Sequence, residues 1–153
     1  QPSTANINDV TKWQFFAGLS GTNATWSSSL GDAKPIAWWD NHMGCVTMTY
    51  NAPLKKYFMC VIEGRYTGES MDTYIMESDK LWGPFKMVKY MARFGEQAYF
   101  ATIPSKFISD DGKTMWLSYS ANFWGWGSEP GSPRVQPEGS TYAWCLTEFT
   151  VNK

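Results

Sequence analysis

The stretch FGEQAYFATIPSKFISDDGKTMWLSYSANF, residues 94–123, predicts a β-hairpin. Two runs rich in β-branched and aromatic residues flank Asp110-Asp111-Gly112, and an Asp-Gly pair between such runs is a strong hairpin signal. The turn is expected at residues 110–113. Glu96 and Gln97, which precede the first strand, are polar residues that a buried strand does not need.

Outside this hairpin, turn residues recur and helical periodicity is nearly absent, which predicts an all-β chain. Short, evenly spaced strands are typical of a sandwich or a propeller. Strands bounded by Gly, Pro, Asn, Asp or Ser are expected at residues 13–18, 24–28, 44–50, 56–63, 72–78, 85–90, 98–109, 114–121 and 141–151.

An internal repeat favours the propeller. Residues 44–90 predict a four-stranded antiparallel meander. Residues 98–151 predict a second meander from the strands at 98–109, 114–121 and 141–151, interrupted by a Gly/Pro/Ser-rich insertion at residues 125–140. Meanders that repeat every ~50 residues are typical of propeller blades. We expect one domain, residues 1–153, with a partial blade at residues 13–37 and blades at 38–93 and 94–151.

Composition excludes several classes of partner. The 153 residues include 13 basic and 14 acidic ones, and no Lys/Arg cluster is longer than Lys55-Lys56, so no nucleic-acid partner is expected. No apolar run approaches the ~18 residues of a membrane span, and no charged, apolar leader opens the chain. We therefore expect no membrane span, and any signal peptide to have been removed.

The cysteines and the single histidine argue against a metal or a cofactor. Closing a hairpin at the turn Asn51–Leu54 is expected to place Cys45 opposite Cys60, where a disulfide is possible but strained, so two buried thiols are favoured. Cys145 is left over. No Cys-x-x-Cys or His-rich spacing indicates zinc, and His42 alone cannot make a metal site.

Aromatic residues make up 17% of the chain. Flat aromatic rings stack on sugar rings, but large side chains also fill gaps between sheets, and both interpretations are open. Trp38 and Trp39 point opposite ways if extended, so one is expected to line the mouth of a site. Trp124, just before the insertion, and Trp126, within it, are either a sugar platform or a plug over a neighbouring blade.

Four stretches resemble a known family. They are WQFFAGLSGTNATWSSSLGDAKPI (13–36), TYNAPLKKYFM (49–59), WGPF (82–85), and the opening stretch with its Ile103–Phe107 motif. Together they resemble the C-terminal part of secreted five-bladed propeller proteins, glycoside-hydrolase-like relatives of endo-arabinanases, over about residues 12–149. The resemblance implies sugar chemistry.

The chain is shorter than this resemblance requires. A five-bladed ring needs roughly 250 residues at this repeat length, whereas about two blades and part of a third are predicted. We expect either a missing N-terminal propeller chain as a partner or self-association. In such hydrolase folds the nucleophile or base usually comes from an early blade, which this stretch would lack.

Polar residues at one end of the predicted blades form the candidate site. Because neighbouring strands run antiparallel, residues before an inner strand lie at the same end as residues after its partner. Glycosidases need two carboxyl groups, and the catalytic candidates are Glu63, Asp72 and Glu96. The candidates for substrate binding are Asp40, His42, Arg65, Gln97, Tyr99, Tyr119, Asn122, Trp38 and Trp39.

Several of these residues have a structural alternative. Glu63 follows an apolar run, so it is either a half-buried general acid or the ion-pair partner of Arg65. His42 has either a structural hydrogen bond or a role in proton transfer or ligand binding. Glu96 and Gln97 are either an ordinary polar loop or a contact to ligand.

Three functions therefore remain open: a glycoside hydrolase acting on a polysaccharide through a central channel, a non-catalytic glycan-binding module, and an assembly protein that associates through open blade edges. Carboxyl groups about 5–5.5 Å apart would indicate a retaining hydrolase, and about 6.5–9.5 Å an inverting one. The sequon Asn23-Ala24-Thr25, the aromatic content and the resemblance favour a secreted protein.

Overall fold

The computed structural model describes residues 4–63, 71–95, 98–121 and 143–152. Over these ranges the chain is all-β, as predicted: the strands form three antiparallel sheets, and the helical segments are single 3-10 turns. None of these turns is long or apolar enough to cross a membrane. The chain divides into two compact units, residues 1–38 with 81–83, and residues 39–80 with 84–153.

The first unit is a β-hairpin with short helical turns. Its strands are β1 (Phe15–Ser20) and β2 (Asn23–Ser27), and its 3-10 turns are η1 (Thr4–Asn6), η2 (Val10–Lys12) and η3 (Leu30–Asp32). Trp82, from the WGPF motif, packs edge-on against Trp26 with the ring centroids 6.3 Å apart. Its indole N–H also donates to the Thr22 carbonyl, so the motif anchors the hairpin.

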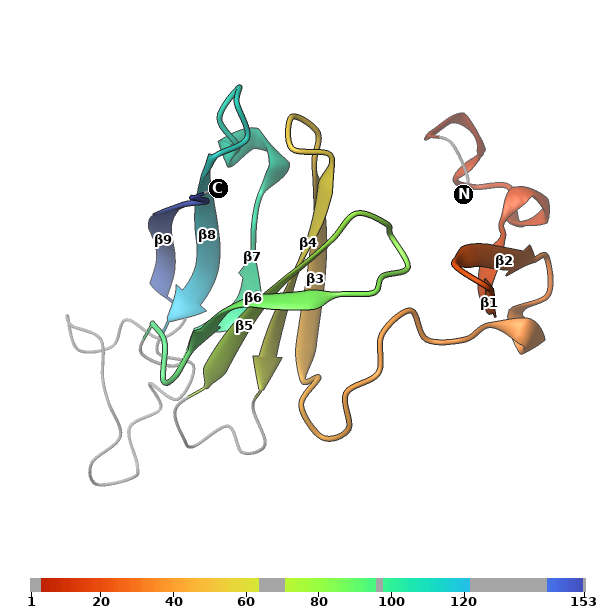
Figure 1. Cartoon of the computed structure of the whole chain (residues 1–153), viewed down its shortest axis with the longest axis horizontal. Helices are drawn as coiled ribbons and strands as arrows, with labels where there is room; N and C mark the ends of the chain where they lie inside the picture. Colours follow the sequence, from red (N-terminus) through yellow and green to blue (C-terminus); the bar gives the residue numbers. More distant parts are fainter. Residues whose placement is uncertain (1–3, 64–70, 96–97, 122–142, 153) are drawn as a thin grey trace. The chain divides into compact units, whose positions relative to one another are not determined.

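The second unit begins with a four-stranded meander. Its strands β3 (Cys45–Asn51), β4 (Lys56–Glu63), β5 (Asp72–Ser78) and β6 (Lys86–Met91) are hydrogen-bonded in sequence order, as the sequence predicts (Figure 1). Alternate residues of β4 face opposite sides, yet residues 58–62 are all buried. This inner strand is therefore covered on both faces.

The register of β3 with β4 corrects the prediction for the cysteines. Cys45 pairs with Ile62 and Cys60 pairs with Thr47, so the two thiols are not opposite each other. The hairpin closes at Asn51 and Lys56, because Lys55 takes a positive φ of 53° and joins the loop. All three cysteines are free, and Cys60 is buried while Cys45 is half-buried.

A three-stranded meander follows, with β7 (Tyr99–Thr102), β8 (Thr114–Ala121) and β9 (Ala143–Thr150) in sequence order. The single strand predicted at residues 98–109 is wrong. β7 ends at Thr102, and Pro104, which has no N–H for a ladder, precedes the 3-10 turn η4 (Ser105–Phe107). The turn at residues 110–113 is confirmed, because Ile108 pairs with Met115.

The hairpin turns of the two meanders lie together (Figure 1). The buried Asn51 side chain donates a 2.8 Å hydrogen bond to the Gly112 carbonyl. Gly112 has a φ of +73°, and a Cβ there would lie 2.5 Å from Asn51 Oδ1. Only glycine fits this close approach.

Two threonines join β3 to β7. Thr47 Oγ1 donates to the Ala101 carbonyl at 2.8 Å, and Thr49 Oγ1 donates to the Ile103 carbonyl at 2.6 Å. Each bond spans 54 residues, and this constant offset means that β3 and β7 run in the same direction. Their first residues therefore lie at the same end of the unit.

One apolar core fills the space between the two sheets. It is built from the side chains that β4, β5, β7 and β8 turn toward each other, and it begins beside the β3–β7 contact. Its buried members are Phe58, Cys60, Ile62, Met71, Ile75, Ala101, Ile103, Met115 and Leu117. The polar side chains of the candidate site lie at the end of the unit opposite the hairpin turns.

Candidate functional site

Two of the predicted catalytic carboxylates face each other across a strand pair. Glu63 ends β4, Asp72 begins β5, and the two residues are directly opposite in the antiparallel register. Both side chains are half-buried. Cβ atoms at such positions are about 4.5–5.5 Å apart, so the two carboxylates leave the sheet side by side.

His42 reaches Glu63 from the loop before β3. Asn41 has a φ of +59°, and the His42 N–H donates to the Trp39 carbonyl, so the chain turns sharply here. The turn places His42 Nδ1 2.7 Å from Glu63 Oε2. When Glu63 is ionised, the proton of this bond lies on Nδ1, because a carboxylate accepts hydrogen bonds and cannot donate them.

Trp39 packs over this pair. Its ring stacks on the His42 ring with centroids 4.5 Å apart and an interplanar angle of 23°. It also meets Tyr74 edge-on at 4.8 Å. The half-buried indole therefore fixes the orientation of the imidazole that faces Glu63.

Two tyrosines hold the carboxylates from the neighbouring strands. Tyr74 on β5 donates to Glu63 Oε2 at 2.9 Å, and Tyr90 on β6 donates to Asp72 Oδ2 at 2.7 Å. The rings stack with centroids 5.0 Å apart, as expected for residues paired across β5 and β6. Trp39, His42, Glu63, Asp72, Tyr74 and Tyr90 are called the Glu63 cluster below.

The environment keeps both tyrosines protonated. Burial, followed by the hydrogen bond to Glu63, raises the pKa of Tyr74 well above its usual range. The hydrogen bond to Asp72 is the main cause of the raised pKa of Tyr90. At neutral pH both hydroxyls therefore remain donors to the carboxylates.

Asp72 is also fixed by the backbone, since the Arg93 N–H donates to its Oδ1 at 2.9 Å. Tyr90 differs from Tyr74 in its exposure: Tyr74 is buried, whereas 49% of Tyr90 is open to solvent. One ring face of Tyr90 covers Tyr74 and its hydroxyl is anchored to Asp72. The cluster thus presents a fixed aromatic ring beside two carboxylates.

Of the residues that the sequence proposes for the site, the structure brings Glu63, Asp72, His42 and Trp39 into contact. Asp40 follows Trp39 and is exposed. Trp38 is 80% exposed and belongs to the first unit, whereas Trp39 belongs to the second. Arg65, Glu96, Gln97 and Asn122, and the tryptophans at 124 and 126, lie outside the described residues.

Tyr99 and Tyr119 do not join the Glu63 cluster. Both are half-buried and pack against the core between the sheets. Tyr99 lies beside Cys45, and the Tyr119 ring lies 5.0 Å from Phe94. Burial raises the pKa of the Cys45 thiol, although the neighbouring Tyr99 hydroxyl opposes this shift.

Sequence reasoning missed Tyr74 and Tyr90. A signal existed, because pairing Glu63 with Asp72 makes Tyr74 the diagonal neighbour of Glu63. Tyr90 could not be placed in the same way, since the register of β5 with β6 shifts after Ile75.

Among the described residues, no group of three His, Cys, Asp or Glu side chains is arranged to hold a metal ion. Searches against protein families, curated proteins and solved structures find no match for the chain.

Proposed function

We propose that this protein binds a polysaccharide at the Glu63 cluster. The observation that carries the proposal is the half-exposed Tyr90 ring, anchored through its hydroxyl to Asp72 and adjacent to the Glu63 carboxylate. An aromatic face suits the C–H face of a sugar, and carboxylates accept hydrogen bonds from vicinal hydroxyls. Strand and ring contacts hold these groups in place before ligand arrives, which lowers the cost of binding.

The pairing of Glu63 with Asp72 supports a second candidate, glycoside hydrolysis. Residues directly opposite on neighbouring strands have Cβ atoms about 4.5–5.5 Å apart, a spacing compatible with the ~5–5.5 Å between the carboxyl groups of retaining glycosidases. His42 and Tyr74 both hydrogen-bond Glu63, which favours its use as a fixed acceptor. Binding is therefore the better supported of the two activities, and Glu96 remains a further candidate for catalysis.

We also propose that the two sheets are adjacent blades of a β-propeller related to the endo-arabinanase-like proteins that the sequence resembles. The parallel alignment of β3 and β7, each the first strand of its meander, supports this arrangement. In a propeller the first strands of neighbouring blades line the central channel. The polysaccharide would then enter at the end of the channel near Glu63, and secretion would give it access to such a substrate.

A missing propeller chain or a second copy of this chain is the proposed partner. Apolar side chains on the sheet faces turned away from the core support it, among them Val46 at 42% exposure and Trp144 at 69%. Light scattering across a concentration series is expected to show association. A monomer at high concentration, from a preparation with no second chain, would contradict this.

A glycan array and a polysaccharide-hydrolysis screen test the proposed site on the native preparation. Tyr90→Ala is expected to weaken binding about tenfold, because the stacking ring is lost, and Tyr90→Phe to weaken it less. Tyr50→Ala is the matched control. Tyr50 is similarly exposed, at 46%, but lies beside the hairpin turn at the end of β3, away from the Glu63 cluster. Glu63→Gln and Asp72→Asn are expected to weaken binding about 10- to 100-fold.

The same variants separate the two activities. Hydrolysis that disappears in Glu63→Gln while binding persists would favour the enzyme. Binding that is equal in Tyr90→Ala and Tyr50→Ala would overturn the site. An absence of both binding and hydrolysis across neutral, acidic and furanose-containing glycans would overturn the proposed function.

A further inference from the structure

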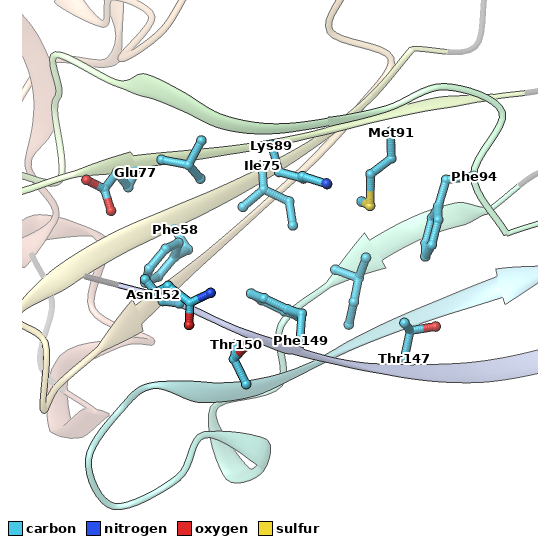
Figure 2. Close-up of a pocket in the computed structure, with 13 residues that line it drawn as sticks. Phe58, Ile75, Glu77, Lys89, Met91, Phe94, Thr147, Phe149, Thr150 and Asn152 are labelled. Carbon is cyan, nitrogen blue, oxygen red and sulfur yellow. The ribbon is translucent and has the colours of Figure 1, made fainter.

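A cavity opens between the two meanders, on the side away from the β3–β7 contact. Its volume is about 460 Å³, within the ~300–1,000 Å³ range of small-molecule sites (Figure 2). The walls come from β4, β5 and β6 on one side and from β8, β9 and the residues after β9 on the other. The cavity is separate from the Glu63 cluster, with which it shares no residue.

The way the sheets are joined explains the cavity. The threonine hydrogen bonds hold β3 close to β7, and β4 also approaches β7, whereas among the described strands β5 and β6 make no comparable contact with β8 and β9. The sheets therefore diverge toward their outer strands. Core side chains fill the narrow part of this wedge, and its wide part stays open.

The floor of the cavity is apolar. Phe58 and Ile75 from the core lie near Phe149 of β9, and Met91 and Phe94 close one end (Figure 2). Leu117 of the core also lines the cavity. An apolar ligand placed here would remove these surfaces and its own from water, which is the main source of binding free energy for such a ligand.

The polar groups at the cavity differ in how they are paired. Glu77 lies 3.8 Å from the Lys56 ammonium, so its charge is already partly compensated. Lys89 has no ion-pair or hydrogen-bond partner among the described residues. It stands directly opposite Ile75, which turns its side chain toward the core side of the sheet.

A β-bulge adds to this wall. The pairing of β5 with β6 shifts between Ile75 and Met76, which leaves Val88 without a partner, and both Val88 and Lys89 line the cavity. Neighbouring residues on a regular strand would face opposite sides. The bulge thus sets an apolar side chain beside a cationic one at the same opening.

We propose that this cavity binds an aliphatic carboxylate of medium chain length, such as decanoate. The alkyl chain lies along Phe58, Leu117 and Phe149, and the carboxylate pairs with the Lys89 ammonium. A charged group at the rim of an apolar pocket fixes the orientation of an amphipathic ligand. This site is independent of the proposed polysaccharide site, so either can fail without the other.

Calorimetric titration with decanoate, decanol and decylamine tests the proposal on the full chain, below the concentration at which these probes form micelles. Decanoate is expected to bind, decanol about tenfold more weakly because it has no charge for Lys89, and decylamine more weakly still. Lys89→Gln is expected to bring decanoate to the affinity of decanol. Lys113→Gln, in the exposed turn before β8 and outside the cavity, is the matched control and is expected to change nothing.

A second variant tests occupancy of the cavity itself. Val88→Trp adds bulk to the wall at a residue that is 49% exposed, so it is compatible with folding, and it is expected to abolish decanoate binding. Circular dichroism confirms that each variant is folded. The proposal is overturned if decanoate fails to bind at about 1 mM, if Lys89→Gln binds as well as Lys113→Gln, or if Val88→Trp binds normally.

Discussion

The Tyr74 hydroxyl donates a 2.9 Å hydrogen bond to Glu63 Oε2 across the diagonal of the β4–β5 ladder. The same oxygen lies 2.7 Å from His42 Nδ1. One carboxylate oxygen therefore ties the loop before β3 to a buried residue of β5. The cluster has a structural role whatever its ligand, and this role can be measured without one.

The bond between Tyr74 and Glu63 is expected to stabilise the fold. Tyr74→Phe and Glu63→Gln should each lower the free energy of unfolding, and a double-mutant cycle should give a coupling of about 0.5–1.5 kcal/mol, typical of a hydrogen bond. Urea unfolding followed by tryptophan fluorescence measures it. Glu148→Gln, on the exposed side of β9, is the control. Additive losses in the cycle would show that the bond contributes nothing.

Stability is expected to fall at alkaline pH. The pKa of Tyr74 is raised above its unfolded value of 10.0, so above pH 10 the unfolded chain has lost a proton that the folded chain still holds. The unfolded state then binds fewer protons, and the free energy of unfolding decreases as pH rises. Urea unfolding from pH 8 to 11 measures this decrease.

Substitution should identify the group. Tyr74→Phe is expected to flatten the fall in stability above pH 10, and Tyr50→Phe to leave it unchanged. Cys60 also has a raised pKa, so some dependence on pH remains in every variant. Equal slopes in Tyr74→Phe and the parent protein would exclude Tyr74 as a cause.

The three thiols should differ in reactivity. Burial raises the pKa of Cys60 to about 12, so this thiol is protonated at neutral pH and shielded from reagents. We expect iodoacetamide to modify Cys45 and Cys145 in the native protein and Cys60 only after denaturation. Mass spectrometry of the alkylated peptides measures this. A Cys45–Cys60 disulfide in the non-reduced protein would contradict the register, in which the two residues are not opposite.

Gly112 should be among the glycines least tolerant of substitution. Gly112→Ala forces a left-handed backbone, at about 1–2 kcal/mol, and drives a Cβ into Asn51 and Leu54, at about 1–3 kcal/mol more. Gly21→Ala shares the left-handed φ but has nothing within 4 Å of the added Cβ, so only the first cost applies. Thermal unfolding of both variants compares them. Equal losses would mean that the contact with the Asn51 turn is unimportant.

Strand positions followed from the sequence where turn residues flank a short run rich in apolar, aromatic and β-branched residues. The ranges expected at 56–63, 72–78 and 114–121 are those observed. Register was harder, because a left-handed Lys55 lengthens the first hairpin loop and moves the partner of Cys45 by two residues. Pro104 could have indicated the end of a strand, but apolar residues lie on both sides of it. One strand was therefore predicted over residues 98–109, although β7 ends at Thr102.

The end of the sheet that carries the candidate site also followed from the sequence, since antiparallel order alone groups His42, Glu63 and Asp72. The tyrosines that hydrogen-bond the two carboxylates could not be predicted. Tyr74 and Tyr90 lie inside strands, and no acidic residue adjoins either of them in the sequence to mark them as partners of a carboxylate. Their hydroxyls reach the carboxylates only because β4, β5 and β6 pair side by side and the pairing of β5 with β6 contains a bulge. This arrangement exists only in the folded sheet.

The threonine contacts between β3 and β7 have a consequence for the order of folding. Each meander closes its own backbone ladder between strands near in sequence, whereas the bonds of Thr47 and Thr49 close a segment of 54 residues. Contacts between distant residues carry a larger chain-entropy cost. We therefore expect the meanders to form first and to dock late, so that losing the Thr49 hydroxyl speeds unfolding and leaves the rate of folding nearly unchanged.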